Sequence, residues 1–371
     1  MSPRWGEESG EEPQSINMSL LWSEERISLS PGCLIPVWLQ LRCSATLRLT
    51  AETQSGVLLL SLLLALFLLA GCRGPQAPTS TSGSDGSFPR TVKMADGTPV
   101  NIPSRPQRII SLTLGNDEIL CALVDEKRIA GLSKFSRDEE TSNVAGVARR
   151  VNVFVDRNAE QIVSLQPDLL LSARYTKIDL KALLAQTSIP LIITTEFRNF
   201  AEIESNIRLI GQAVGEDAKA DATINEMRQK LASARSHLQR EKENLRVLYL
   251  APGNFTAGAG TSIGELLVAA GLKNAAAEAG VKGNVKTAAE QMLQINPDAI
   301  LIATGYERDR GFRQLLESDA QLSSLKAIKE KRIVELPARN VLTVSQHVAD
   351  AVQALVEAVN QLPLIEGGKP K

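Results

Sequence analysis

Ser262 lies in a segment that reads Gly-x-Ser-x-Gly, residues 260–264. This spacing is typical of a nucleophile elbow, in which a serine at a sharp turn directly after a strand attacks an acyl group. The preceding apolar run ends near Leu250, however, so the required strand-to-turn geometry is missing. His347, the candidate base, falls on a predicted amphipathic C-terminal helix. We therefore expect Thr261 or Ser262 to act as a helix N-cap, and a serine hydrolase using Ser262 remains the alternative from another class of function.

Metal and phosphate chemistry are poorly supported by the sequence. The chain contains two histidines, His237 and His347, and both are predicted on helices, whereas a site for a bare transition ion needs clustered imidazole and carboxylate ligands. The Gly-Ala-Gly segment at residues 258–260 lacks the P-loop lysine and the full Rossmann spacing. The sequence therefore predicts no catalytic residues, no metal ligands from the protein and no resident cofactor.

The composition fits a globular α/β protein and excludes a nucleic-acid partner. Basic and acidic residues are nearly balanced at 41 and 42 among 371 residues, so no electrostatic footprint for nucleic acid exists. The length favours two domains. From Phe88 onward predicted strands and helices alternate, which favours parallel sheets covered by helices.

An apolar run at residues 57–70 predicts the hydrophobic region of a signal peptide, because it is too short to span a bilayer comfortably. The run ends in Leu-Ala-Gly-Cys at Cys72, which looks like a bacterial lipobox, in which the cysteine thiol receives a diacylglyceryl group. We therefore expect Cys72 to be lipidated after removal of residues 1–71, of which residues 1–50 are interpreted as an over-extended start. Cys121 would then be the sole other cysteine, so no intramolecular disulfide is expected.

Two distant segments, residues 159–171 and 289–301, nearly repeat each other. Both begin Ala-Glu-Gln, continue with apolar residues and contain Pro-Asp before a second apolar run. Each predicts a short helix that ends before the proline and then a buried parallel strand. A sequence unit that occurs twice implies two lobes of the same construction with a cleft between them.

A stretch from residue 217 to residue 243 has few turn residues and predicts one helix of about 40 Å, long enough to cross a domain. Asn116 is expected to be the N-cap of an earlier helix that runs to Val124. The predicted organisation is a leader at 1–71, a flexible tether at 72–87, an N-terminal lobe at 88–215, a linking helix at 216–243, a C-terminal lobe at 244–363 and a tail at 364–371.

Three segments together resemble the periplasmic binding proteins for iron–siderophores and cobalamin. They are Arg-Pro-Gln-Arg-Ile-Ile-Ser-Leu from Arg105, Asn-Ala-Glu-Gln-Ile-Val-Ser-Leu-Gln-Pro-Asp from Asn158, and Ala-Glu-Gln-Met-Leu-Gln-Ile-Asn-Pro-Asp from Ala289. The likeness covers residues 92–362. It implies an α/β fold of two Rossmann-like lobes with parallel central sheets, joined by a single long α-helix, with a cleft between the lobes.

The resemblance also implies a role. Such a protein is lipid-anchored at the extracytoplasmic face of the cell envelope, acts as a monomer, and delivers a metal chelate to the permease dimer of an ABC importer. In this family a surface glutamate on each lobe docks onto arginines of the permease, and the matching positions are Glu160 and Glu290. The alternative for both is helix capping, because acids in a first turn oppose the macrodipole. Residues 287–290 also fit a capping box.

The clefts of this family are lined by aromatic side chains and by arginines that meet acidic groups. The matching positions in this sequence are Phe135, Phe154, Arg174, Tyr175, Phe255, Tyr306 and Arg339. An isolated loop phenylalanine can equally cover its own lobe, so both readings stay open for the phenylalanines.

The ligand itself is less constrained. Val153 stands where haem-binding relatives place a ligating tyrosine, and residues 172–174 lack the tryptophan of cobalamin binders. Arg174 and Arg339 would pair bidentately with a negatively charged ferric siderophore. The prediction is a binding protein for a ferric siderophore that brings its own chelated metal, with a corrinoid as the alternative. A tethered sensor shares all of these features.

Overall fold

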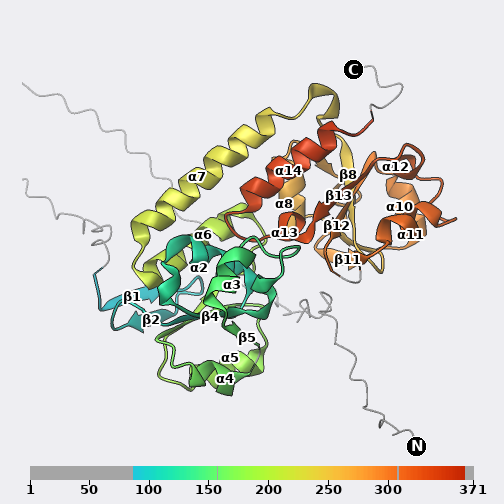
Figure 1. The fold of residues 1–371 in the computed structure, drawn as a ribbon. Coiled ribbons are helices and arrows are strands. Elements are labelled where there is room, and N and C mark those ends of the chain that lie inside the picture. Colours follow the sequence, from blue (N-terminus) through green and yellow to red (C-terminus); the bar gives the residue numbers. More distant parts are fainter. Residues whose placement is uncertain (1–86, 157, 307–308, 364–371) are drawn as a thin grey trace, which may run out of the picture. The chain divides into compact units, whose positions relative to one another are not determined.

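The computed structural model describes residues 87–156, 158–306 and 309–363 (Figure 1). The predicted leader, Cys72, nearly all of the tether and the tail at 364–371 lie outside the described residues. A short antiparallel hairpin precedes the first lobe, with strands β1 (Arg90–Lys93) and β2 (Pro99–Ile102). Its turn contains Asp96 and Gly97, and Gly97 has a φ of 85°, which a residue without a Cβ adopts at little cost.

A parallel five-stranded sheet forms the centre of the N-terminal lobe, in the order β5-β4-β3-β6-β7. The strands are β3 (Ile109–Ser111), β4 (Ile129–Ser133), β5 (Phe154–Val155), β6 (Leu169–Ala173) and β7 (Leu191–Thr194). All five residues of β6 are buried, as expected for an apolar strand covered on both faces. The accompanying helices are α2 (Leu114–Leu123), α3 (Ala145–Val151), α4 (Ala159–Ser164), α5 (Ile178–Ala185) and α6 (Phe200–Val214).

The C-terminal lobe repeats this plan with a parallel four-stranded sheet in the order β10-β8-β12-β13. Its strands are β8 (Arg246–Leu250), β10 (Lys273–Asn274), β12 (Ala299–Thr304) and β13 (Ile333–Pro337), beside an antiparallel pair of β9 (Phe255–Ala257) and β11 (Asn284–Lys286). Its helices are α8 (Ser262–Ala269), α9 (Ala275–Glu278), α10 (Ala289–Ile295), α11 (Phe312–Ser318), α12 (Lys326–Lys329), α13 (Ala338–Val341) and α14 (Val348–Asn360). The predicted α/β class with parallel central sheets is confirmed.

Helix α7 (Asp217–Ser236) belongs to both cores. Ile224 and Met227 pack in the core of the first lobe, whereas Ala234 packs in the core of the second. The helix lies beside α14 (Figure 1) and has 20 residues, so it is about 30 Å long. It is shorter than the predicted helix because the chain leaves it after Ser236 and continues into a short 3-10 turn at Arg240–Lys242.

The prediction for Asn116 is wrong. Thr113 is the N-cap of α2, and Asn116 is fully buried one turn later. Its amide nitrogen donates to the carbonyl of Ser172 at 2.9 Å, and its oxygen accepts from the hydroxyl of Thr194 at 3.1 Å. Asn116 therefore ties together the carboxyl ends of β6 and β7.

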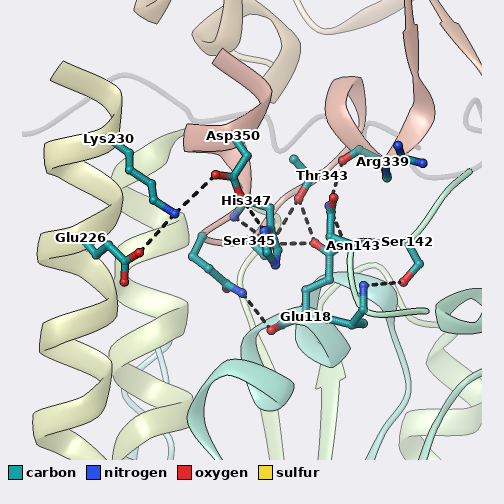
Figure 2. Close-up of polar contacts among 12 residues, drawn as sticks. Glu118, Ser142, Asn143, Glu226, Lys230, Arg339, Thr343, Ser345, His347 and Asp350 are labelled. Carbon is teal, nitrogen blue, oxygen red and sulfur yellow. Dashed lines mark hydrogen bonds and ion pairs between the residues drawn. The ribbon is translucent and has the colours of Figure 1, made fainter. Parts of the chain in front are cut away.

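A second connection between the lobes is made by what we call the junction cluster, namely Glu118, Asn143, Thr343 and Ser345 (Figure 2). Glu118 is 1% exposed. Its Oε1 accepts from the backbone and side-chain nitrogens of Asn143 at 3.0 and 2.9 Å. Its Oε2 accepts from the hydroxyls of Thr343 and Ser345 at 2.8 and 2.6 Å. One buried carboxylate thus holds the segment before α14 against the N-terminal lobe.

Candidate functional site

The two repeated units end at the same cavity. Arg174 and Tyr175 follow β6 of the first unit, and Tyr306 follows β12 of the second. All three line a cavity of 420 Å³ whose walls come from both lobes. This size is within the range of small-molecule sites. Its other described lining residues are Glu196, Phe197, Arg198, Gly260, Thr261, Ser262, Ile263, Asn284, Leu342 and Val344.

An adjoining cavity of 210 Å³ shares Tyr175 and Tyr306 with the first and adds Phe135. The ring of Phe135 lies under the ammonium group of Lys134, 5.7 Å from the ring centroid. Lys134 is also ion-paired with Asp156 at 2.8 Å. The structure thus brings four of the predicted ligand residues, Arg174, Tyr175, Tyr306 and Phe135, to one connected region.

The charged side chains that line the 420 Å³ cavity are two arginines and one glutamate. Glu196 lies between two arginines, 3.6 Å from Arg174 and 3.7 Å from Arg198. These separations exceed hydrogen-bond length, so the carboxylate does not occupy the donors of either guanidinium directly. Arg198 is held by hydrogen bonds to Glu202 at 2.8 and 3.1 Å, which raise the pKa of its guanidinium. Arg198 is thus paired with Glu202, whereas Arg174 is 73% exposed and has no carboxylate within hydrogen-bond distance among the described residues.

Tyr175 is a neutral phenol at physiological pH. It keeps 38% of its surface accessible, yet the surrounding cavity walls remove enough water to raise the pKa of Tyr175 to about 12. A protonated phenol donates a hydrogen bond and stacks on planar groups, whereas a metal ligand of this type would have to lose its proton. The geometry favours contact with the organic part of a ligand.

Glu196, Phe197 and Arg198 were not predicted as site residues. Phe197 has a φ of 59°, which is unusual for a bulky side chain and costs on the order of 1–3 kcal/mol. Its ring is buried in the core of the N-terminal lobe, and this burial offsets the strain. The turn directs its two charged neighbours to the cavity. Their position after the strand at Leu191–Thr194 was the available signal, because ligands bind beyond the carboxyl ends of parallel strands.

Phe154, Phe255 and Arg339 are not among the described residues that line either cavity. Phe154 pairs with Leu132 in the first sheet, and Phe255 is a strand residue of β9. The backbone nitrogen of Arg339 donates to the carbonyl of Glu140 at 3.0 Å, which places this arginine at the contact between lobes. Their roles as ligand residues remain predictions.

A larger cavity of 490 Å³ lies elsewhere, between α2, α3, α7 and the start of α14. Its lining includes Cys121, Lys230, His347 and Asp350. Here Nδ1 of His347 lies 2.8 Å from Asp350, and Lys230 lies 3.1 Å from Glu226 (Figure 2). These charges satisfy one another, and none of the predicted ligand residues reaches this cavity.

The exposed carboxylates of Glu160 and Glu290 stand in the first turns of α4 and α10. The capping-box interpretation of Glu290 is wrong. Ala288 is the N-cap of α10, the backbone nitrogen of Thr287 donates to Asn254 at 2.8 Å, and the hydroxyl of Thr287 contacts Gln291. Among the described residues neither glutamate side chain forms a hydrogen bond or an ion pair, so permease docking and a simple dipole effect remain as interpretations.

Ser262 does not form a nucleophile elbow. It begins α8, far along the chain from the end of β8 at Leu250. Thr261 is the N-cap, and its hydroxyl accepts from the backbone nitrogen of Gly264 at 3.0 Å. His347 lines a different cavity and contacts Asp350. Over the described part of the chain no group of three or more His, Cys, Asp or Glu residues could hold a metal ion, and no helix is long and apolar enough to cross a membrane.

Two parallel-sheet lobes that share one helix and enclose a ligand-sized cavity define a binding protein of the two-lobed class. The chain belongs to the Periplasmic binding protein family, whose model matches residues 109–340. Members of this family are binding proteins, so the chain is not an enzyme and the hydrolase alternative falls away.

Relatives support the same class. The chain is 27% identical over 309 residues to the uncharacterized ABC transporter substrate-binding lipoprotein YvrC of Bacillus subtilis, covering 81% of this chain and 95% of the relative. It is 28% identical over 247 residues to a cobalamin-binding protein of Halobacterium salinarum, covering 65% and 66%. The apo periplasmic heme-binding protein RhuT from Roseiflexus sp. RS-1 has a similar fold, with a TM-score of 0.61 at 24% identity over 69% of this chain and 98% of RhuT.

Proposed function

We propose that this chain is the substrate-binding component of an ABC importer, and that it captures an anionic metal chelate in the cavity bounded by Arg174, Arg198, Tyr175 and Tyr306. A ferric siderophore is the favoured ligand. The exposed guanidinium of Arg174 at the cavity wall is the observation that carries the proposal, because guanidiniums pair with carboxylate and catecholate oxygens. The similarity to ABC transporter substrate-binding lipoproteins of Bacillus subtilis supports the transport role.

The ligand is proposed to bring its metal already chelated. The two tyrosines and Phe135 offer aromatic faces to the organic part of such a chelate, and the arginines offer charge. A corrinoid is the second candidate, favoured by the similarity to a cobalamin-binding protein. A corrinoid would use the aromatic faces and make little use of the cationic wall.

The proposed setting is the extracytoplasmic face of the cell envelope. Lipidation at Cys72 and a tether at 72–87 would hold a monomeric binding protein at the membrane, and the lipoprotein relatives support this anchor. Glu160 and Glu290, one on each lobe, are proposed to contact arginines on the two subunits of the permease.

Titration of the protein from residue 73 onward tests the ligand. The tryptophans lie at positions 5, 22 and 38, so tyrosine fluorescence reports binding of anionic ferric siderophores, neutral ferric siderophores, cobalamin and haem. We expect tight binding of an anionic ferric siderophore, weakened about tenfold to a hundredfold by Arg174→Ala, because one charge-assisted contact is lost. Arg228→Ala is the matched control, since Arg228 is exposed on α7 and paired with Glu204.

Two results would redirect the proposal. Binding of cobalamin with no response to ferric siderophores would assign the corrinoid. Equal losses in the Arg174 and Arg228 variants would exclude the cationic wall as the ligand contact.

A further inference from the structure

Residues 138–143 of the N-terminal lobe contact the C-terminal lobe, and we call this segment the strap. Its first half, residues 138–140, is exposed, whereas Thr141 and Ser142 are 7% and 3% exposed. Asn143, at its end, is bonded to the buried carboxylate of the junction cluster. The strap therefore has a buried root in the N-terminal lobe and an exposed tip, residues 138–140.

One arginine of the C-terminal lobe holds the tip. The backbone nitrogen of Arg339 donates to the carbonyl of Glu140 at 3.0 Å, and its Nη1 donates to the carbonyl of Glu139. At the root of the strap, Nδ2 of Asn143 donates to the carbonyl of Arg339 at 2.9 Å (Figure 2). The tip is thus fastened to the other lobe by two bonds at the protein surface, and exposed backbone bonds open at a lower free energy than buried ones.

A glycine of the C-terminal lobe lies against the tip. Gly305 has a φ of 123°, and a Cβ at this position would lie 2.8 Å from the Cβ of Glu140. A residue without a Cβ permits this close approach. Gly305 directly precedes Tyr306, which lines both ligand cavities, and Phe135, three positions before the strap, lines the smaller one. The contact between tip and C-terminal lobe therefore lies beside the ligand-facing segments of both lobes.

Two other connections between the lobes are built differently. Helix α7 has side chains buried in both cores. In the junction cluster the carboxylate of Glu118 is 1% exposed and accepts four hydrogen bonds. Breaking either connection exposes apolar surface or strands buried polar groups, which costs more free energy than releasing two exposed bonds. The tip therefore opens more easily than either of these connections.

We propose that the strap is an entry latch, clasped by Arg339, which opens to admit the ligand and closes again once the ligand is bound. Opening of the tip frees the segments that follow β12 and β13, while α7 and the junction cluster keep the lobes together. Those segments carry Tyr306 and Leu342 of the cavity wall. In this role Arg339 acts through the strap and needs no contact with the ligand. The inference rests on the proposed function and concerns how its ligand enters.

Hydrogen exchange of the ligand-free protein from residue 73 onward tests whether the tip opens by itself. The backbone amide of Arg339 is bonded to the tip, and that of Asn143 is bonded to Glu118. After correction for intrinsic rates, the amide of Arg339 should exchange at least about tenfold faster than that of Asn143. Equal exchange would mean that the tip opens together with the junction cluster, and this result would overturn the latch.

Stopped-flow tyrosine fluorescence then measures association and dissociation of two probes, a ferric tricatecholate siderophore and cobalamin. Arg339→Ala removes one charge-assisted bond to the tip, so both rate constants should rise about tenfold. Because the clasp is made before entry and again after it, Kd should stay within about twofold. Arg149→Ala is the matched control, since Arg149 pairs with Glu139 from within the N-terminal lobe, and its rate constants should equal those of wild type.

Arg339→Lys keeps a cation that can donate to the tip, and its rate constants should lie within about threefold of wild type. A rise in the dissociation rate constant alone, with a weaker Kd, would make Arg339 a ligand contact and refute the latch. Wild-type rate constants in Arg339→Ala would refute it as well. If neither probe binds to wild type, the proposed function falls, whereas the exchange of the Arg339 and Asn143 amides still decides whether the tip opens.

Discussion

The junction cluster makes a sharp prediction about Glu118, which joins the N-terminal lobe to the segment before α14. Replacing Glu118 by alanine removes one carboxylate that accepts four hydrogen bonds. Not all four donors are then stranded. The hydroxyls of Thr343 and Ser345 lie 3.1 Å apart and can bond to each other, and the side-chain nitrogen of Asn143 keeps its bond to the carbonyl of Arg339 at 2.9 Å.

The loss of stability in Glu118→Ala therefore comes from two sources. The backbone nitrogen of Asn143 loses its acceptor, Oε1 of Glu118, and an unsatisfied buried donor costs about 1–3 kcal/mol. The truncated side chain leaves a small cavity, which adds about 1–2 kcal/mol. Removing a buried carboxylate whose hydrogen-bond donors are all neutral offsets part of this loss of stability. We expect the free energy of unfolding to fall by about 2–4 kcal/mol in Glu118→Ala.

Glu118→Gln distinguishes geometry from charge. A glutamine can keep its oxygen toward Asn143 and turn its amide toward the two hydroxyls, which can reverse and accept. We expect a loss of about 1 kcal/mol or less in this variant. Urea unfolding of the protein from residue 73 onward, with midpoint and slope fitted separately, measures both values. A loss below about 1 kcal/mol in the alanine variant, or equal losses in both variants, would refute the account of the junction cluster.

Four further predictions concern separate parts of the molecule. Burial raises the pKa of Asp117 to about 7, above its unfolded value near 3.9; the folded state therefore holds an extra proton between these pH values, and its stabilising effect is lost as pH rises toward 7. Asp117→Asn escapes this loss, so its unfolding free energy relative to wild type should increase by about 2–3 kcal/mol from pH 5 to pH 8, and a pH-independent difference would contradict the assignment. Burial also raises the pKa of the Cys121 thiol, so iodoacetamide at pH 8 should label it slowly in the native protein and rapidly in urea; equal rates would show an accessible thiolate. A Cβ at Gly211 would lie 2.5 Å from Cβ of Ala220, so Gly211→Val should separate α6 from α7 and lower the unfolding free energy by about 1–3 kcal/mol in urea titration, whereas an unchanged midpoint would mean that the helices yield freely. Glu160→Ala combined with Glu290→Ala should abolish uptake in cells while fluorescence titration gives unchanged ligand affinity, and normal uptake would remove these residues from docking.

Local sequence patterns predicted the elements well and misplaced several polar side chains. The repeat at residues 159–171 and 289–301 located both short helices and the strands that precede Tyr175 and Tyr306. Asn116 and Thr287 carry good capping side chains, so local rules assigned them to helix ends. In the folded chain Asn116 instead bonds to β6 and β7, and Thr287 bonds to Asn254 and Gln291. Such partners are distant in sequence or set by tertiary packing, and no local spacing reveals them.

The arginines at the 420 Å³ cavity show a second limit of prediction from sequence. Arg174 was recognised because it directly follows an obvious buried strand. Arg198 was missed because its direction depends on the left-handed backbone of Phe197, which the residue type disfavours. Burial of the phenylalanine ring selects that conformation. The ring is buried only once the lobe has packed, so the sequence around Phe197 does not reveal the conformation.

Each strand that joins a repeated short helix, α4 or α10, to a tyrosine also fixes a length. Strand β6 has five residues and β12 has six, which corresponds to about 17–20 Å at the usual rise per residue. Both are bonded to neighbours on two sides, so neither stretches when the cavity fills. A rotation of a lobe by about 5° about its tyrosine end therefore shifts the far end of the strand by about 1.5–1.7 Å. If Glu160 and Glu290 contact the permease as proposed, a rotation of the lobes changes the spacing of these two contact points, and the permease can read occupancy as a distance.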